Sequence, residues 1–250
     1  MVTPIPADYL PTFHSDTIEL NLHRIAGLSE RFVLFNDDMF LLRPVAPGDF
    51  FRKGLPVLPC DLGVPKWLGN TNASRVVVKN AGVLKRSLDV ERLLRKRLGK
   101  IADVRALGFG RAAKNLVSLA VNGIWIPSTF GHVGLPHLKS TFEEIWRVRP
   151  ETMDRTSRSR FRIDDGVNHW LACAWNVATG RFVPINEKRT GKSVTLSDET
   201  LGSVCADIRD RVRPQICIND TDRIADPARC FAEVAAAFDA ILPDKSSFEK

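Results

Sequence analysis

The sequence predicts an α/β fold, because amphipathic helical segments alternate along the chain with short apolar runs that are typical of strands. One such pair is a helix that opens at Ser15 or Asp16, followed by the β-prone run Arg31–Phe35. Another is the apolar run Ile216–Ile218, followed by an Ala-rich helix over Asp226–Leu242. The sequence shows no internal repeat, no low-complexity region and no clear domain boundary, so we expect a single domain.

The first 72 residues are expected to contain one helix, one strand and a long connection. The helix carries apolar residues at the spacing i, i+4 and i+7, and Gly27 ends it. These apolar residues are Ile18, Leu22 and Ile25. Met39–Leu42 is apolar again, and residues 44–72 are rich in proline and glycine, which indicates a long loop of the kind that often binds ligands.

The rest of the chain is expected to continue the alternation. The predicted elements are, in order, a buried strand at Val76–Val78, helices over Asp89–Leu98 and Ala112–Val121, a loop over Thr129–Lys139 and a helix over Ser197–Val212. Ser140-x-x-Glu143 matches a capping box that opens a helix. Asp164 or Asp165 can cap the next helix, which Gly180 ends. The buried face of this last helix is expected to include Val167, Leu171 and Trp175.

Composition indicates a globular protein with an anionic partner. The hydrophobic fraction is 44% and the charged fraction 26%, and no apolar run approaches the roughly 18 residues of a membrane span. The net charge of +7 fits nucleic acid, phosphorylated small molecules or an anionic membrane surface. The N-terminus lacks the charged-then-apolar pattern of a signal peptide, so we do not expect secretion by the usual route.

The five cysteines are expected to be reduced thiols. They are scattered and odd in number and contain no Cys-x-x-Cys pair, which argues against a disulfide framework and against a structural zinc site. They are Cys60, Cys173, Cys205, Cys217 and Cys230.

Asn36-Asp37-Asp38 stands where the first predicted strand ends. One interpretation is an ordinary polar turn. The other is a binding site, because ligands of α/β sheets bind beyond the carboxyl ends of the strands. In that case the two carboxylates and the asparagine suit a hard cation such as Mg²⁺ that bridges phosphates. The residue types alone leave both interpretations open.

The predicted loop and the basic stretch after it have the same two interpretations. His132 or His137 can accept a proton from an attacking hydroxyl, or can be an ordinary surface or structural histidine. Six arginines follow, which can clamp phosphate or form a solvated basic face. They are Arg147, Arg149, Arg155, Arg158, Arg160 and Arg162. Only Trp146 and Phe161 lie near them, so the stacking aromatics of a nucleic-acid site are few.

Gly108-Phe-Gly110-x-x-Ala113 matches a loose dinucleotide-binding fingerprint, which we reject. A true fingerprint follows a strand and has an acidic residue about 20 positions further on. No Asp or Glu lies between Asp103 and Glu143.

Three long blocks, in order, resemble the Stealth family of hexose-1-phosphate transferases. That family includes bacterial capsular polysaccharide phosphotransferases and the animal GlcNAc-1-phosphotransferase α/β subunit. LPTFHSDTIELNLHRIAGLSERFVLFNDDMF is very close to the family's second conserved block, over residues 8–50. Phe130-Gly131-His132 and PETMDRTSRSRFRIDDGVN resemble the third block, over 128–180. CINDTD and the terminal SSFEK resemble the fourth, over 214–250, which makes residues 1–250 one domain of this type.

The resemblance implies a Rossmann-like, glycosyltransferase-type α/β core. Such an enzyme transfers a sugar together with its α-phosphate from a nucleotide-sugar, such as UDP-GlcNAc, to a glycan hydroxyl. It implies a cytoplasmic protein with peripheral association at the inner face of the membrane, and no nucleic-acid partner. The alternative is a non-catalytic module that binds sugar nucleotides or anionic glycans.

The resemblance also implies roles for individual residues. Asp37 and Asp38 would hold Mg²⁺ or Mn²⁺, phosphates or sugar hydroxyls. His132 would be the general base on the acceptor, and Arg162 would neutralise charge on the transferred phosphate. Glu19 would orient this group. Further substrate-binding candidates are Asn36, Asn219 and Asp220.

The chain departs from the family pattern in three places. The family's first block, a strand with a Tyr-Thr-Trp-Val-Asp-Gly-like sequence, is missing, so we expect a core that is incomplete at the N-terminus. His14 replaces the usual Asn or Ser before Ser15, and Gly134 stands where a proline is common.

Overall fold

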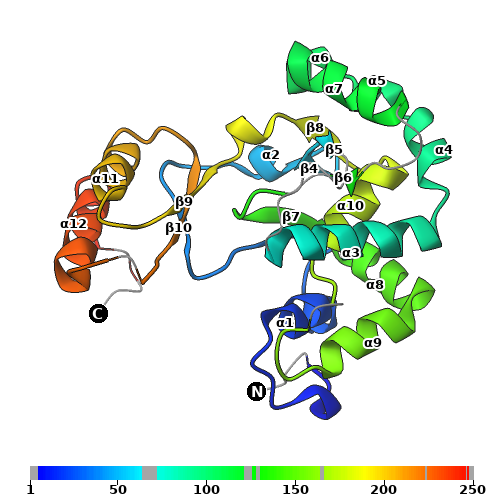
Figure 1. Cartoon of the computed structure of the whole chain (residues 1–250), viewed down its shortest axis with the longest axis horizontal. Helices are drawn as coiled ribbons and strands as arrows, with labels where there is room; N and C mark the ends of the chain where they lie inside the picture. The colour runs from blue at the N-terminus through cyan, green and yellow to red at the C-terminus, as the bar shows by residue number, and fades with distance from the viewer. Residues whose placement is uncertain are drawn as a thin grey trace. The chain divides into compact units, whose positions relative to one another are not determined.

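The computed structural model describes most of the chain, namely residues 5–63, 72–120, 126–127, 130–163, 166–222, 224–245 and 247. Helices and short strands alternate, and the strands form small sheets, so the α/β class is confirmed (Figure 1). Among the helices of this part of the chain, none is both long and apolar enough to cross a bilayer.

The chain divides into two compact units, and each is assembled from three segments. Unit 1 consists of Met1–Leu34, Gly48–Phe130 and Leu135–Asn186. Unit 2 consists of Phe35–Pro47, Gly131–Gly134 and Glu187–Lys250. We expected residues 1–250 to form a single domain of the family type, and this expectation stays a prediction, because the division into compact units does not test it.

The strands of unit 1 pair over long sequence distances. They are β1 (Arg31–Leu34), β3 (Phe51–Arg52), β4 (Leu55–Pro59), β5 (Leu62–Gly63), β6 (Ile126–Pro127), β7 (Leu135–Leu138) and β8 (Val183–Ile185). β1 is antiparallel to β7, and β5 is antiparallel to β6. β4 lies between β3, to which it is antiparallel, and β8, to which it is parallel. A parallel pair needs a long crossover connection, and here the crossover contains most of the helices of unit 1.

One helix of unit 1, α10 (Trp170–Thr179), is almost fully buried, and three other helices pack against it. All residues from Leu171 to Ala178 are buried, and α10 contacts α3, α4 and α8. Gly180 ends it with a φ of +78°, a left-handed conformation that glycine adopts without strain. The other helices are α1 (Ser15–Asn21), α2 (Pro47–Phe50), which begins at the end of unit 2, α3 (Asn72–Ser87), α4 (Val90–Arg95), α5 (Leu98–Ile101), α6 (Val104–Leu107), α7 (Phe109–Ala120), α8 (Lys139–Val148) and α9 (Pro150–Arg158).

Unit 2 is a three-stranded sheet with two helices. Its strands are β2 (Met39–Leu41), β9 (Lys192–Thr195) and β10 (Gln215–Asn219). β10 is central, antiparallel to β2 and parallel to β9. α11 (Leu201–Arg209) and α12 (Pro227–Asp239) lie side by side (Figure 1). The core of this unit includes Leu42, Leu196, Leu201, Ile208, Ile216 and Ile241.

Several predicted elements are confirmed. β1 and β10 occupy the predicted strands, and α12 begins after Asp226, whose side chain accepts a hydrogen bond from the Arg229 backbone N–H at 3.0 Å. Leu171 and Trp175 are buried on α10 as predicted. The predicted start of this helix is wrong, because α10 begins at Trp170 with His169 as its N-cap, so the buried Val167 precedes the helix. The predicted capping residues Asp164 and Asp165 lie outside the described residues.

Two predictions between residues 44 and 87 are wrong. Val76–Val78 is not a strand but part of α3. Val77, Ala81 and Leu84 are buried at the spacing i, i+4 and i+7, so the helical period of the apolar residues decided the conformation. Residues 44–72 are not one loop, because they contain α2, β3, β4 and β5.

Two predictions around residue 139 are also wrong. Thr129–Lys139 contains a fully buried strand, β7. Ser140 does not form a capping box, because α8 begins at Lys139 without a side-chain cap and both the Ser140 hydroxyl and its backbone N–H donate to the Glu30 carboxylate. The Glu30 carboxylate thus takes the place of Glu143, the partner that the capping box predicted.

Candidate functional site

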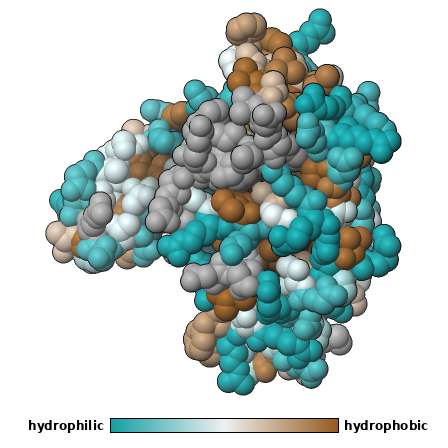
Figure 2. Space-filling model, turned by 45° about the vertical axis from the view of Figure 1, so that its right-hand side comes forward, coloured by the Kyte–Doolittle hydropathy of each residue, from teal (hydrophilic) through white to brown (hydrophobic). Residues whose placement is uncertain are grey.

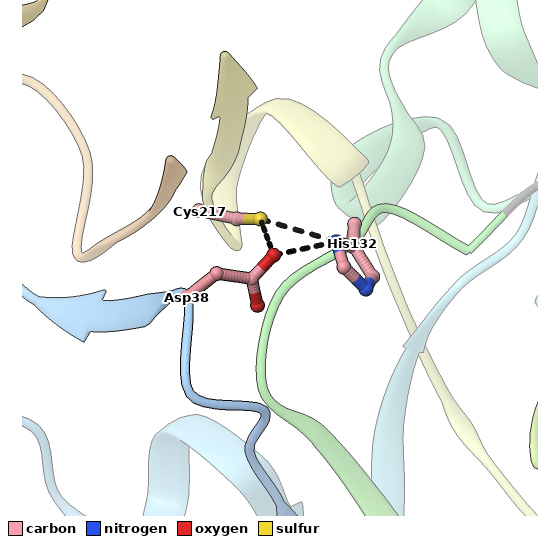
Figure 3. A group of neighbouring side chains, drawn as sticks. All are labelled: Asp38, His132 and Cys217. Atoms are coloured by element: carbon pink, nitrogen blue, oxygen red, sulfur yellow. Dashed lines mark hydrogen bonds and ion pairs between the residues drawn. The ribbon is translucent and has the colours of Figure 1, made fainter. Parts of the chain in front are cut away.

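Three side chains from the three segments of unit 2 meet at the central strand (Figure 3). Asp38 lies in the turn before β2, His132 lies in the segment Gly131–Gly134, and Cys217 lies in β10. One potential ligand atom of each, a carboxylate oxygen, an imidazole nitrogen and a thiol sulfur, lies within 4.8 Å of the other two. This is the one group of its kind that the described residues contain.

The pairing of β2 with β10 brings Asp38 to Cys217. Met39 is the register partner of Cys217, so the residue before Met39 lies beside that pair. The Ile218 backbone N–H donates to the Asp38 carbonyl at 2.9 Å, which extends the ladder into the turn. The turn after the first strand is therefore held directly against the end of the central strand.

The segment that carries His132 is fixed by a close approach at Gly134. Its backbone N–H donates to the Gln215 side-chain oxygen at 2.9 Å. A Cβ at this position would lie 2.5 Å from the Phe35 ring and 2.8 Å from Gln215 Oε1, so no side chain fits there without rearrangement. The departure from the family pattern at Gly134 is thus accommodated by an aromatic ring that fills the space.

The hydrogen bonds at the site fix the tautomer of His132. The amide nitrogen of Asn36 lies 3.1 Å from Nε2 and donates to it, so Nε2 carries the lone pair. Nδ1 then carries the proton, and it lies 3.1 Å from Cys217 Sγ and 3.4 Å from Asp38 Oδ2. This imidazole, with Nδ1 hydrogen-bonded to Cys217 Sγ and the Asp38 carboxylate nearby, can act as a base at Nε2.

Cys217 is a hydrogen-bond donor at this site rather than a nucleophile. Its thiol donates to Asp38 Oδ2 at 3.1 Å. Burial raises the pKa of this thiol to about 12, helped by the hydrogen bond to Asp38 and the charge of Asp38, and opposed by Ser193 and Asn219. The thiol is therefore protonated at neutral pH.

Asp38 offers one oxygen to a ligand. Oδ1 is buried, and no group of the described chain donates a hydrogen bond to it. A buried acceptor in this state fits a cation or a donor from a bound molecule. Mg²⁺ prefers oxygen ligands, so Asp38 alone of the three fits Mg²⁺ well, whereas the full set of oxygen, nitrogen and sulfur is more typical of a softer ion such as Zn²⁺.

The structure places the remaining predicted residues of unit 2 around this group. Asn36 contacts His132, and Asn219 donates to Cys217 Sγ at 3.4 Å. Asp37 and Asp220 are exposed on the adjoining turns and are not part of the group. Sequence reasoning missed Cys217, although the period of two along a strand puts it on the same face as Asn219.

Glu19 and Arg162 lie in unit 1, where they interact electrostatically. Glu19 is buried on α1, and burial raises the pKa of its carboxyl to about 7, with a further increase from the charge of Asp16. A hydrogen bond from the His169 backbone and the charge of Arg162 oppose this increase. Arg162 itself is exposed.

His137 has a structural role. It is fully buried in β7, its Nε2 lies 3.1 Å from His169 Nδ1, and its ring packs against Phe32 and Phe142. Burial lowers the pKa of His137 to about 3, so this imidazole is neutral. The second histidine of the predicted loop is therefore a core residue.

The arginine run is divided among different partners. Arg149 donates to the Ser87 hydroxyl at 2.7 Å, and Arg158 pairs with Asp154 at 2.7 Å. These two guanidinium groups have partners within unit 1, and phosphate binding by the other arginines of the run stays a prediction. The rejected fingerprint is also explained, because the helix α6 precedes Gly108 instead of a strand.

All five cysteines are free thiols, as expected, and all five are buried.

Comparison with known proteins gives consistent matches. Residues 4–57 match the sequence model of Stealth protein CR2, conserved region 2. Capsular polysaccharide phosphotransferase WcwK of Streptococcus pneumoniae is 37% identical over 98% of this chain and 72% of its own length. Receptor polysaccharide phosphotransferase WefC of Streptococcus oralis is 33% identical over 97% and 71%. Exopolysaccharide phosphotransferase cps2G of Lactiplantibacillus plantarum is 31% identical over 98% and 71%.

Proposed function

This chain belongs to the Stealth family, and we propose that it is a phosphotransferase that transfers a sugar phosphate to a glycan acceptor in the synthesis of a capsular or other cell-surface polysaccharide. The relatives that carry this name match nearly the whole chain, including all three segments of unit 2. They do not favour the alternative of a non-catalytic binding module.

The observation that carries the mechanism is the contact of His132 with Asp38 and Asn36. The acceptor hydroxyl takes the position of the Asn36 amide at Nε2 and gives its proton to that nitrogen. Its oxygen forms the new bond to the phosphorus that carries the sugar, while the bond from that phosphorus to the bridging oxygen of the nucleotide phosphate breaks and the nucleoside monophosphate leaves. Asp38 stabilises the imidazolium that forms, as the carboxylate of a catalytic triad does.

We propose that Asp38, through its free Oδ1, and Asp37 beside it hold Mg²⁺ or Mn²⁺. When bound, such an ion neutralises negative charge on the donor phosphates. Asn219 and Asp220, at the carboxyl end of β10, are proposed to contact the donor, because ligands of α/β sheets bind at such ends.

We propose that Arg162 of unit 1, which is exposed, binds an anionic group of the substrate. Glu19 is proposed to orient this arginine through the electrostatic interaction between them. We further propose a Rossmann-like, glycosyltransferase-type core, a nucleotide-sugar donor such as UDP-GlcNAc, and a cytoplasmic location at the inner face of the membrane.

The test is release of UMP from UDP-GlcNAc by the purified chain with Mg²⁺ and a glycan acceptor. His132→Gln should lower kcat by roughly 10²–10⁴-fold, because the base is lost while the volume and one polar contact remain. Donor binding by calorimetry and the thermal unfolding midpoint should stay unchanged in this variant. Full activity of His132→Gln would remove this residue from the mechanism. No release of the matching nucleoside monophosphate from any nucleoside diphosphate sugar would refute the proposed reaction for this chain.

A further inference from the structure

The positive charge of the chain is concentrated in one segment of unit 1. From Lys85 to Lys114 there are ten Lys and Arg residues and three Asp and Glu residues, so the net charge of this segment is +7. The whole chain has 36 basic and 29 acidic residues, which leaves 26 of each outside the segment. The excess charge therefore belongs to the stretch from the end of α3 through α4, α5 and α6 into α7.

The helix α7 is apolar on its exposed face as well as on its buried face. Ala112, Asn115, Ser118 and Leu119 are buried. On the opposite face lie Phe109, Ala113, Leu116 and Val117, at the spacing i, i+4, i+7 and i+8. The side chains of Phe109 and Val117 are 79% and 56% exposed. A surface helix of a soluble protein normally carries polar residues on that face, so this apolar stripe needs a partner.

The two short helices before α7 add to this exposed apolar surface. Leu98 opens α5 and Val104 opens α6, and both side chains are exposed. Each has an arginine next to it in the chain, Arg97 and Arg105 respectively. The space-filling view shows brown apolar atoms beside teal hydrophilic atoms over α5–α7, at the top of the molecule (Figure 2).

Part of the positive charge is available to an external partner. Arg92, Lys96 and Arg105 are exposed and form no ion pair with any described residue. Other cations hold the helices in place. Arg111 and Lys114 both pair with Asp61, at 2.7 and 2.6 Å, and Lys100 donates to the carbonyl oxygens of Gly180 and Phe182 at 2.7 Å. These ion pairs and hydrogen bonds hold α5 and α7 against the rest of unit 1.

We propose that this α5–α7 surface, formed by Leu98, Val104, Arg105, Phe109, Leu116 and Val117, binds the surface of a bilayer that contains anionic phospholipids. Phe109 and the aliphatic side chains would enter the boundary between headgroups and acyl chains, while Arg105, Lys96 and Arg92 meet the anionic headgroups. Nucleic acid explains the charge but leaves the exposed aliphatic stripe without a partner, because phosphate contacts need polar donors. The inference gives a physical basis to the membrane location proposed above, but it does not depend on catalysis.

The experiment is co-sedimentation of the full chain with vesicles of phosphatidylcholine, with and without phosphatidylglycerol. Binding should require phosphatidylglycerol and weaken as salt is added. The double variant Phe109→Glu and Val117→Glu should weaken binding at least about tenfold. The matched control is Val212→Glu and Leu242→Glu, which changes two exposed apolar residues of unit 2 and should bind like the unmodified chain.

Three results would overturn the proposal. They are no binding to phosphatidylglycerol vesicles, equal weakening in the control variant, and unchanged binding of the Phe109→Glu and Val117→Glu variant. Tighter retention of a single-stranded oligonucleotide than of vesicles, lost in the same variant, would assign the surface to nucleic acid instead. UMP release with a soluble acceptor should be unchanged in all these variants, so a failure of membrane binding leaves the proposed enzyme activity intact.

Discussion

Cys217 is a positioning residue for His132, because its sulfur is hydrogen-bonded to the imidazole Nδ1 and its thiol donates to the Asp38 carboxylate. Cys217→Ser keeps a donor and should retain most of the activity. Cys217→Ala removes the group that holds both Asp38 and the imidazole in place, and should lower kcat roughly tenfold.

The separate effects on kcat and KM distinguish this role from simple packing. Cys217→Ala should lower kcat while KM for the donor stays unchanged, because the thiol contacts His132 and Asp38. Cys217→Ser should restore kcat, because its hydroxyl can donate to Asp38 as the thiol does. A Ser variant with the same low kcat as the Ala variant would show that the cysteine acts through packing alone.

Glu19 predicts a pH dependence of stability. Burial raises the pKa of its carboxyl from 4.5 to about 7, so between these values the unfolded chain loses this proton while the folded chain keeps it. The contribution of Glu19 to the free energy of unfolding is therefore present below pH 4.5 and falls as pH rises through 7. Glu19→Gln should remove this fall. The free energy of unfolding of the variant, relative to the unmodified chain, should therefore rise by about 1–3 kcal/mol from pH 4 to pH 8.

Urea denaturation at several pH values measures this difference. Glu143→Gln, which changes an exposed glutamate of α8, is the control and should leave the slope with pH unchanged. An equal pH slope in Glu19→Gln and the unmodified chain would show that the buried carboxyl titrates normally.

At the scale of elements, sequence periodicity predicted the helices and strands whose buried side is continuous. The strand around Ile216–Ile218 and the helix with Leu171 and Trp175 are examples. Val76–Val78 was misread because β-branched residues favour strands locally, whereas burial of Val77 and Leu84 on one helix face outweighs that preference. The buried strand Leu55–Pro59 was missed because its prolines indicate a loop.

The candidate site was only partly predictable for a related reason. Asp38 and His132 were found from the family blocks, and Cys217 could have been found from its position two residues before Asn219 in the strand. That they meet depends on the approach of Gly131–Gly134 to the central strand, which lies about 80 residues further along the chain. No local pattern contains that contact.

A substitution at Gly134 tests how closely the segment Gly131–Gly134 must approach the central strand. In Gly134→Ala the new Cβ would meet the Phe35 ring and Gln215 Oε1, so the variant should lose about 1–3 kcal/mol of stability and some transfer activity. Gly202→Ala is the matched control, because nothing lies within 4 Å of its Cβ position in α11. It should gain up to about 1 kcal/mol from better helix propensity. Denaturant midpoints of both variants decide this, and equal stability of the two would show that Phe35 moves aside freely.

At the scale of the whole molecule, unit 2 takes one segment from each third of the chain, and each segment brings one residue of the site. Phe35–Pro47 contributes Asp38, Gly131–Gly134 contributes His132, and Glu187–Lys250 contributes Cys217. The same division applies to the sheet, because β2 comes from the first segment while β9 and β10 come from the last. Neither the sheet nor the site can form from one continuous piece.

A fragment of residues 187–250 should therefore not fold by itself. It lacks β2, which pairs with one side of the central strand, and Leu42, which is part of the core of this unit. Both losses expose apolar surface and unpaired backbone groups on a piece too small to compensate for them. Its amide NMR spectrum should be poorly dispersed, and addition of the peptide 35–47 should increase the dispersion if the pairing of β2 is what is missing. A well-dispersed spectrum of the fragment alone would show that the last segment is an independent domain, and that Asp38 and His132 dock onto a sheet that forms without them.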